Sequence, residues 1–392
     1  MDVAILGGGI AGLATAISLK QIGKTVRVYE RRRSMHHLGA GIVCWPNATF
    51  VLSELGVLDR LRSVAGAVTA MRRISKTGDE LGSLDIRQLD SAMGFPSLSV
   101  LRRDLMRILV GRADELGIPI HYGADAAMID GVQDGNRVHF SDGTSTLADL
   151  VVGADGRMNS VARRYVVGNN QPVFQGFVNW IGVYQRDSAF QRLEICDYWG
   201  LGARFGIVPV SESTAYWAGG VAIADADGAC DLDSIVQLRR AFDGWPVPVG
   251  EIVSQGSASD TRRLILYDHD PLPQWHKDNV LLVGDAAHAA LPTSGQGAGQ
   301  ALEDAWVLGR ELAAFPGDHE TAIAAFTQKR REKTAGITLA GRRLAGILFN
   351  TDETECADRD QKATRTDYAA MVAGMATGWG AGLPMGIEHR FG

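Results

Sequence analysis

The first thirty residues constrain the fold of this chain more than any other stretch. An apolar run ends at Leu6 and is followed by Gly7-x-Gly9-x-x-Gly12, a small-residue segment and a second strand-like run that ends at Glu30. In the strand-turn-helix-strand unit that this spacing predicts, the glycines provide a tight turn, a close backbone approach to a pyrophosphate and close packing of helix on strand. The helix start favours an anion, and an acid at this distance meets the ribose hydroxyls. The stretch therefore predicts a dinucleotide site at Gly9, Gly12 and Glu30.

Composition limits the remaining possibilities. The chain has 392 residues, of which 46% are hydrophobic and 21% are charged, so we expect a globular protein of about two domains. The net charge is −6 and Lys and Arg are dispersed, which argues against a nucleic-acid surface. No signal peptide or membrane span is expected, and a soluble, cytoplasmic protein is predicted. The four cysteines lack C-x-x-C spacing, so neither a disulfide framework nor a metal site is expected.

Two further segments have nucleotide-binding character. A strand-like run at 150–152 leads into Gly153-Ala154-Asp155-Gly156, with Ser160 and Arg163 following on the next helix. A carboxylate at a small-residue turn can reach sugar or phosphate groups, so Asp155 is a predicted contact. Later, a buried-type strand ends at Gly284-Asp285, and the glycine-rich segment 295–299 opens a long helix through Ala314, whose free N–H groups suit an anionic ligand. His288 could act as a base, although a structural role is the commoner one for such a histidine.

Residues 172–262 change to alternating β patterns with aromatic residues. Runs at 203–210 and 214–222 predict a hairpin centred on Glu212, which places Arg204 and Tyr216 on one face with Cα atoms roughly 13 Å apart. A small ring bound between them could touch both side chains. Arg204 could instead be an exposed sheet charge, which is the commoner role for an arginine in such a strand.

Other features are weaker on their own. Gly41 marks a place where backbone passes close to something flat or bulky, or a glycine-rich loop entering a helix. Residues 48–62 have near-helical leucine spacing. Arg102 begins a predicted helix to about residue 116, where a cation opposes the helix dipole and needs an anion nearby. Helical periodicity continues over 320–348, and the last forty or so residues are predicted to be irregular.

The three glycine-acid motifs, in this order and spacing, resemble the fingerprints of the single-component FAD-dependent aromatic hydroxylases. The resemblance covers roughly residues 1–350 and implies the para-hydroxybenzoate hydroxylase fold. This is an α/β architecture with a Rossmann-like FAD-binding domain, an inserted β-sheet substrate domain and C-terminal helices. The FAD-binding domain is expected at 1–70, 98–172 and 265–350, the substrate domain at 71–97 and 173–264, and a C-terminal tail at 351–392.

The resemblance also implies roles for individual residues. Glu30 would bind the adenosine ribose, Asp285 the ribityl or pyrophosphate region, and Asp155 the loop linked to FAD and NAD(P)H. Arg102 would lie on the flavin side, and Pro292 with residues 295–299 would border the isoalloxazine ring. The full set of cofactor-binding positions is Gly9, Gly12, Glu30, Arg31, Gly41, Arg102, Asp155, Asp285, Gly295, Gly297 and Ala298. Arg31 belongs to a run of three arginines that also fits a solvated turn.

Within the family, Trp45-Pro46-Asn47, Arg204 and Tyr216 look most similar to the bacterial FAD-dependent urate hydroxylases. There, a matching arginine and tyrosine hold the purine, so Arg204 and Tyr216 are the candidate catalytic residues and form the substrate pocket with Pro292. Salicylate-type and nicotinate-type hydroxylases share the same cofactor pattern.

The implied activity is hydroxylation of a small anionic aromatic or N-heterocyclic ring through a flavin C4a-hydroperoxide, with NADH or NADPH and O2 as cosubstrates. Urate 5-hydroxylation is the leading candidate, and salicylate, hydroxybenzoate or hydroxynicotinate hydroxylation is the alternative. A monomer or homodimer is expected. Two other classes remain open: an NAD-dependent dehydrogenase, which would leave the motifs at Asp155 and Asp285 without a role, and a non-catalytic flavin-binding protein.

Overall fold

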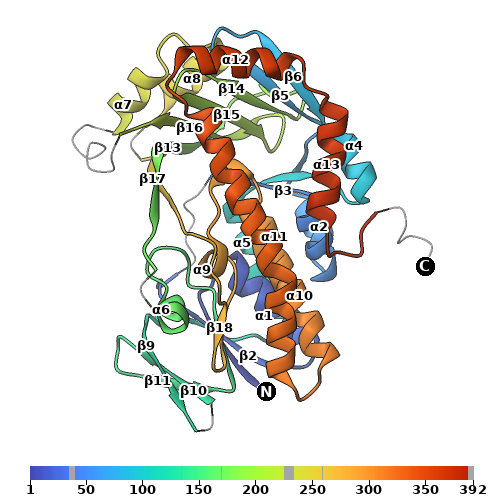
Figure 1. Ribbon diagram of the computed structural model, residues 1–392, viewed down its shortest axis with the longest axis vertical. Helices are drawn as coiled ribbons and strands as arrows, with labels where there is room; N and C mark the ends of the chain where they lie inside the picture. The colour runs from blue at the N-terminus through green and yellow to red at the C-terminus, as the bar shows by residue number, and fades with distance from the viewer. Residues whose placement is uncertain (35–39, 134, 169, 225–233, 258, 387–392) are drawn as a thin grey trace.

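The strand predicted at the start of the chain lies inside a six-stranded sheet (Figure 1). The computed structural model describes residues 1–34, 40–133, 135–168, 170–224, 234–257 and 259–386. The strand order of this sheet is β18 (His276–Lys277), β19 (Val280–Leu282), β12 (Leu150–Gly153), β1 (Asp2–Leu6), β2 (Thr25–Glu30) and β8 (Ile120–Tyr122). All neighbours are parallel except β18 and β19. The loops that follow β1, β2, β12 and β19 therefore gather at one edge, where ligands bind in sheets of this kind.

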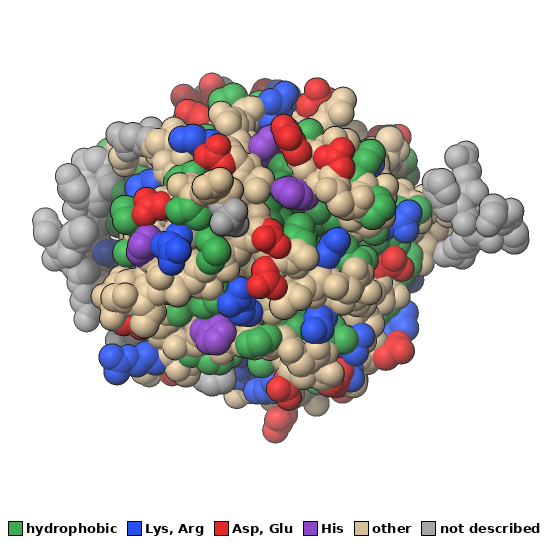
Figure 2. All heavy atoms as spheres, turned by 90° about the horizontal axis from the view of Figure 1, so that it is seen from below, with side chains coloured by type: hydrophobic (Ala, Val, Ile, Leu, Met, Phe, Trp, Pro, Cys, Tyr) green, Lys and Arg blue, Asp and Glu red, His purple; other side chains and the backbone are tan. Residues whose placement is uncertain are grey.

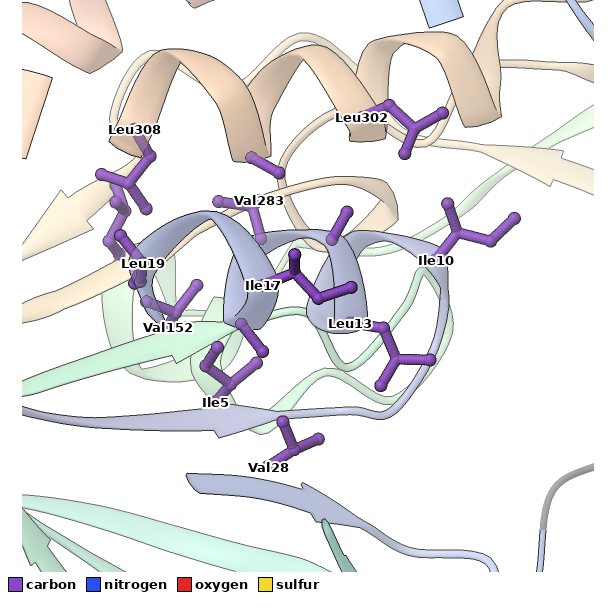
Figure 3. Close-up of a cluster of buried hydrophobic side chains, with 14 of the residues drawn as sticks. Ile5, Ile10, Leu13, Ile17, Leu19, Val28, Val152, Val283, Leu302 and Leu308 are labelled. Atoms are coloured by element: carbon purple, nitrogen blue, oxygen red, sulfur yellow. The ribbon is translucent and has the colours of Figure 1, made fainter. Parts of the chain in front are cut away.

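Helix α1 (Ile10–Gln21) packs between this sheet and α10 (Gly297–Ala314). Because both sides of the helix are buried, its residues are apolar or small on nearly every side. Figure 3 shows Leu13 and Ile17 of α1 among side chains from the strands and from α10. A Cβ at Gly309 of α10 would lie 2.2 Å from Ser18 Oγ, so this glycine permits the close approach of the two helices. Helix α5 (Arg102–Glu115) also packs on α1.

A seven-stranded sheet lies above the first in Figure 1. Its order is β17 (Arg262–Asp268), β13 (Val173–Gln185), β16 (Thr214–Ala222), β15 (Ala203–Pro209), β14 (Glu194–Trp199), β5 (Ala70–Ser75) and β6 (Glu80–Asp85). On one face of this sheet, Phe205 and Trp217 pack against helices α7 (Ser234–Ala241) and α8 (Val247–Gln255). Aromatic and apolar residues of these strands and helices form one core. The opposite face is left for the rest of the molecule.

Two small sheets and the remaining helices complete the chain. The sheets are β9 (Ala126–Val132) with β10 (Gly135–Phe140) and β11 (Ser145–Ala148), and β3 (Gly41–Cys44) with β7 (Leu98–Leu101) and β4 (Gly66–Ala67). The helices are α2 (Pro46–Glu54), α3 (Leu58–Arg62), α4 (Ile86–Met93), α6 (Val161–Val167), α9 (Asp285–His288), α11 (His319–Leu348), α12 (Glu353–Thr364) and α13 (Tyr368–Gly380), with a 3-10 turn at Pro292–Ser294. Helix α11 runs from the level of the lower sheet to the upper one (Figure 1).

The predicted hairpin and the helices α5, α10 and α11 are confirmed. Two expectations are wrong. Residues 48–62 form two helices rather than one, because the chain leaves α2 through Gly56, whose φ of +75° is left-handed. The tail is not irregular, because it contains α12 and α13. The readable signals were Asp352 and Asp367, whose side chains cap these helices by accepting from the N–H groups of Glu355 and Ala370.

The described residues contain no membrane-spanning helix and no metal-binding cluster, and the face seen in Figure 2 carries mixed charges. Within the described ranges, no helix has the length and apolarity needed to cross a bilayer, and no group of three His, Cys, Asp or Glu residues is arranged for a metal ion. On the face shown in Figure 2, basic and acidic side chains are interspersed. Three residues of the sequence patterns lie outside the described residues: Gly39 of the glycine-rich loop before Gly41, Asp134 of an expected Asp-Gly turn, and Cys230, one of the four cysteines.

Candidate active site

The glycine turn after β1 has the geometry of an anion-binding helix start. Gly7 adopts φ +106°, and a Cβ there would lie 2.3 Å from the carbonyl oxygen of Ala154 in the second glycine loop. A Cβ at Gly12 would lie 1.9 Å from the Gly7 carbonyl oxygen, so only glycine fits. At Gly9, by contrast, a Cβ would meet nothing within 4 Å. Helix α1 has neither a side-chain cap nor an acid in its first turn, so its N–H groups face open space at Gly9.

Glu30 lies beside this turn at the end of β2. Its Oε2 accepts from the Gly8 N–H at 2.8 Å and its Oε1 from the Arg32 N–H at 2.9 Å. The backbone thus holds the carboxylate next to the start of α1. Arg31, the neighbouring predicted contact, has an exposed side chain.

Asp155 has a different set of partners from those expected. Its carboxylate accepts from Ser160 Oγ at 2.5 Å and from the N–H groups of Val161 at 2.6 Å and Ala162 at 3.2 Å. These bonds tie the carboxylate to the start of α6, while burial raises its pKa. A direct contact with nucleotide stays a prediction.

Asp285 begins α9, shortly after β19, and its carboxylate contacts Arg157. Arg157 donates to its Oδ2 from Nε at 3.1 Å and from Nη2 at 2.9 Å. Burial would raise the pKa of Asp285, but Arg157, His288 and Arg102 outweigh it and the pKa is lowered. Arg102 begins α5 with an exposed side chain, and its backbone N–H donates to the Ala40 carbonyl at 3.1 Å. The structure thus brings Arg102 into the electrostatic environment of Asp285.

The predicted flavin-facing segment forms a second uncapped helix start. The 3-10 turn at Pro292–Ser294 ends at Gly295 in the left-handed region, φ +62°, and α10 begins at Gly297 with no side-chain cap and no acid in its first turn. A Cβ at Gly297 would meet nothing within 4 Å. Trp45 Nε1 donates to the Gly295 carbonyl at 3.0 Å and holds the turn in place. Ala298, the next predicted contact, is partly accessible in the first turn of α10.

The substrate-side prediction of a shared face agrees with the strand register. Val208 pairs with Tyr216 and Arg204 with Gly220, so the hairpin is centred on Glu212. Because side chains alternate along a strand, Arg204 and Tyr216 project from the same face, opposite to the face that packs on α7 and α8. Tyr216 shares a cluster with Trp45, which places this face toward the Gly295 turn.

Gly41 explains how Tyr216 is seated. A Cβ at Gly41 would lie 1.9 Å from Tyr216 Cδ1, so the flat group expected near this glycine is the tyrosine ring. Burial raises the pKa of Tyr216, with Cys44 adding to the shift and Arg204 opposing it. Its hydroxyl therefore stays protonated over the physiological range and can donate a hydrogen bond.

Arg204 has a buried partner that the sequence did not reveal. Its Nε donates to Asp197 Oδ1 at 2.6 Å, and Trp199 Nε1 donates to Asp197 Oδ2 at 2.9 Å. The two terminal nitrogens of Arg204 have no acceptor among the described residues. A guanidinium has five N–H donors, so four of those of Arg204 have no acceptor among the described residues. An acid at an inward position of a strand was the available signal.

A buried polar network beneath the Gly295 turn was also missed. Asn47 Nδ2 donates to Gln296 Oε1 at 2.8 Å and to Glu303 Oε1 at 2.7 Å. Arg330 of α11 pairs with Glu303 at 2.5 Å and with Asp304 at 2.8 Å, and both acids are fully buried.

This network includes His288. Its Nε2 lies 2.5 Å from Asp304 Oδ2, which agrees with the structural role favoured for this histidine. The signal for the network was a pair of acids inside an apolar helix, which requires cationic partners when buried.

Comparison with known proteins decides the family. The model of the family described as FAD binding domain matches residues 1–338 of the chain. The chain belongs to this family of FAD-dependent monooxygenases. FAD is the cofactor, and the open backbone at Gly9 and Gly297, each at an uncapped helix start, fits its anionic and electron-accepting parts. The NAD-dependent dehydrogenase alternative is thereby removed.

Relatives of this FAD-dependent chain cover nearly all of it. It is 32% identical to the FAD-dependent urate hydroxylase of Mycolicibacterium vanbaalenii, over 90% of each chain. It is 33% identical to the 3-amino-4-hydroxybenzoate 2-monooxygenase of Streptomyces cremeus, over 97% of this chain and 96% of the relative. Among solved structures, Klebsiella pneumoniae HpxO complexed with FAD and uric acid superposes with a TM-score of 0.87 at 27% identity, covering 97% of this chain and 96% of HpxO. The para-hydroxybenzoate hydroxylase-like fold predicted from sequence is confirmed.

Proposed function

We propose that this monooxygenase uses NADH or NADPH and O2 to hydroxylate a small planar aromatic or N-heterocyclic ring, with 5-hydroxylation of urate as the leading candidate. The observation that carries the proposal is that the terminal nitrogens of Arg204 have no acceptor among the described residues and lie on the same sheet face as Tyr216, whose ring packs in one cluster with Trp45. The similarity to HpxO, solved with FAD and uric acid, supports urate.

In this proposal, residues around the six-stranded sheet hold FAD and residues of the seven-stranded sheet hold the substrate. Bound FAD supplies the two-electron redox chemistry and the activation of O2. In this proposal the glycine turn at Gly9 and Gly12 holds the pyrophosphate, Glu30 the ribose, and Asp285 with Arg102 the middle of the cofactor. The start of α10, from Gly295 to Ala298, faces the isoalloxazine ring, where its N–H groups stabilise negative charge.

The seven-stranded sheet orients the ring. Arg204 donates charge-assisted hydrogen bonds to acceptor atoms of the substrate. Tyr216, kept protonated by burial, donates a further hydrogen bond from the neighbouring strand, four residues along from the position that pairs with Arg204. Together with Pro292 these side chains hold the reacting carbon in place and exclude water. A ring that carries delocalised negative charge is more nucleophilic and can accept the hydrogen bonds of Arg204.

A substrate screen tests the activity. NADH and NADPH oxidation is measured on the FAD-loaded protein with urate, salicylate, hydroxybenzoates and hydroxypyridines, and products are identified by mass spectrometry. We expect urate to stimulate oxidation most and to yield a product heavier by one oxygen atom. Stimulation by none of these rings would refute the proposal and favour a non-catalytic flavin protein.

The variant Arg204→Gln tests the anchor. Because it removes charge-assisted hydrogen bonds, we expect kcat/KM for the best ring to fall by about 10 to 100-fold, with the flavin content unchanged. Arg263→Gln is the matched control, because Arg263 lies on the opposite face of the same sheet and donates to Gln237 of α7. Equal kinetics for the two variants would remove Arg204 from the site.

Hydroxybenzoate-type substrates are the second candidate. The Streptomyces cremeus relative, named for 3-amino-4-hydroxybenzoate, is as similar to this chain as the urate hydroxylase is. A carboxylate would also meet Arg204, and the screen separates the two classes directly.

A further inference from the structure

Asp197 is the buried acid that contacts Arg204 in the candidate substrate site. Its side chain is 7% exposed, against 24% for Arg204. Both of its oxygens are occupied, Oδ1 by Arg204 Nε and Oδ2 by Trp199 Nε1. Because the Asp197 side chain is almost fully buried and each oxygen already accepts a hydrogen bond, we expect it to influence a ligand through its charge and through the position of Arg204.

The strand register puts the acid where it can hold the arginine from the side. Asp197 pairs with Gly206, and Trp199 pairs with Arg204, so all these positions share one face of the sheet. The guanidinium lies close to the backbone of Gly206, since a Cβ there would be in ordinary van der Waals contact with Arg204 Nη2, at 3.8 Å.

Trp199 fixes the acid in turn. The guanidinium carbons of Arg73 and Arg359 lie 5.1 Å and 5.3 Å from the centroid of its ring, within the range of cation–π contacts. Arg359 belongs to α12, so the C-terminal helices support the indole whose N–H holds Asp197.

This arrangement has a geometric and an electrostatic consequence. Holding Arg204 by Nε leaves its two terminal nitrogens as a planar pair of donors. At the same time, the negative charge of Asp197 offsets the positive charge of Arg204. A ligand at the donor pair therefore gains full hydrogen bonding but only part of the attraction that an isolated arginine would exert on an anion.

We propose that Asp197 determines the charge specificity of the substrate site. Asp197 positions Arg204 and offsets its charge. This favours planar rings with adjacent lactam-like acceptors, neutral or with delocalised charge, over rings that bear a carboxylate. The inference rests on the proposed function, since it assumes that Arg204 faces the substrate ring. Asp197 is a positioning and specificity residue in this scheme, since it does not touch the ring.

The test compares an anionic probe with a neutral isostere. Dissociation constants of salicylate and salicylamide are measured near neutral pH on the FAD-loaded protein, from perturbation of the flavin spectrum and by calorimetry. In Asp197→Asn, which keeps the size of the side chain and removes its charge, we expect the preference for salicylate over salicylamide to rise by about fivefold or more. Asp197→Glu, which keeps the charge, should retain a ratio close to that of the unmodified protein.

A matched control separates this effect from the loss of any buried ion pair. Asp268 is a fully buried acid whose two oxygens bind Arg342 at 2.7 Å and 2.8 Å, away from Arg204. Asp268→Asn should leave the salicylate-to-salicylamide ratio unchanged. If Asn at position 197 lowers flavin content, Asp197→Ser removes the same charge with a smaller side chain.

The outcomes are distinguishable. An unchanged ratio in Asp197→Asn and Asp197→Ser, or a similar rise in Asp268→Asn, overturns the inference, as does failure of every protein to bind either probe. If Arg204→Gln weakens both probes while Asp197→Asn leaves their ratio unchanged, the inference on Asp197 fails and the anchor at Arg204 stands. If Arg204→Gln affects neither probe, the proposed substrate site itself fails.

Discussion

At the scale of single residues, the candidate site depends on a glycine whose lack of a side chain makes room for a tyrosine ring. Gly41 and Tyr216 came from unrelated patterns in the sequence, yet the structure puts the backbone of one against the ring of the other. This contact ties the small sheet containing β3 to the seven-stranded sheet that carries Tyr216.

Gly41→Ala tests this contact. The new methyl group would lie 1.9 Å from Tyr216 Cδ1, so the ring must move, and we expect a loss of about 1 to 3 kcal/mol in the free energy of unfolding. Urea titration monitored by tryptophan fluorescence measures it. Gly336→Ala in α11 is the control, since a Cβ there meets nothing within 4 Å and alanine favours a helix by about 0.5 to 1 kcal/mol. Equal stability of the two variants would contradict the contact.

At the scale of elements, the C-terminal helices are integrated into the site region. Lys333 of α11 donates to the carbonyls of Trp379 and Ala381 at 2.7 Å and 2.8 Å, at the end of α13, and pairs with Glu303 at 2.9 Å. A lysine at the last carbonyls of a helix satisfies them and interacts favourably with the dipole. The Trp379 ring lies 5.2 Å from that of Trp45, the residue that holds the Gly295 turn.

Lys333→Met should release the end of α13. Because it removes one partner from a buried ion pair, we expect a loss of about 3 kcal/mol in stability and faster amide hydrogen exchange over residues 375–381. Hydrogen exchange with mass spectrometry localises the change. Lys362→Met removes an exposed pair with Asp358 on α12 and should change stability by less than about 0.5 kcal/mol. Uniform protection of α13 in both variants would show that Lys333 does not anchor it.

At the scale of the whole molecule, α11 connects the two large sheets. Its lower half carries Arg330, which pairs with the acids of α10. Its upper half packs Leu348 with Leu291 and Trp199 in one cluster. The turn before α10 and strand β14 thus both pack against one long helix (Figure 1).

The buried acids predict how stability depends on pH. In the folded protein the pKa of Asp304 is lowered: burial would raise it, but His288 and Arg330 outweigh that effect. A lowered carboxyl pKa gives stability that is present above the ordinary value of about 4 and is lost as pH falls through the folded value. Asp285 acts in the same direction, whereas Asp155, with a raised pKa, acts in the opposite one.

We therefore expect the free energy of unfolding to decline below about pH 4, measured by urea titration from neutral pH downward. Asp304→Asn should lower stability at neutral pH by about 3 to 5 kcal/mol and make the acid decline shallower. Asp59→Asn, at an acid whose side chain is 94% exposed, should leave the pH profile unchanged. A profile of Asp304→Asn parallel to that of the unmodified protein would contradict the assignment.

Local patterns were sufficient to predict the glycine turns and helix starts at which nucleotide binding is expected. The spacing of Gly7, Gly9 and Gly12 reflects contacts within a few residues or between neighbouring strands, so it can be read from the chain alone. The hairpin that aligns Arg204 with Tyr216 follows from strand alternation about one turn. These features depend on backbone geometry, which a short stretch of sequence largely determines.

Tertiary structure decided which polar groups are partners. Asp197 with Arg204 can be sought along one hairpin, but Asn47 with Glu303, and Lys333 with the end of α13, join segments far apart in sequence. Their pairing depends on how helices and sheets pack, because a buried charge is stable only beside a partner that the fold brings to it. The sequence alone determined the cofactor class and the main elements, and the packing of α10, α11 and α13 decided how the Gly295 turn is supported.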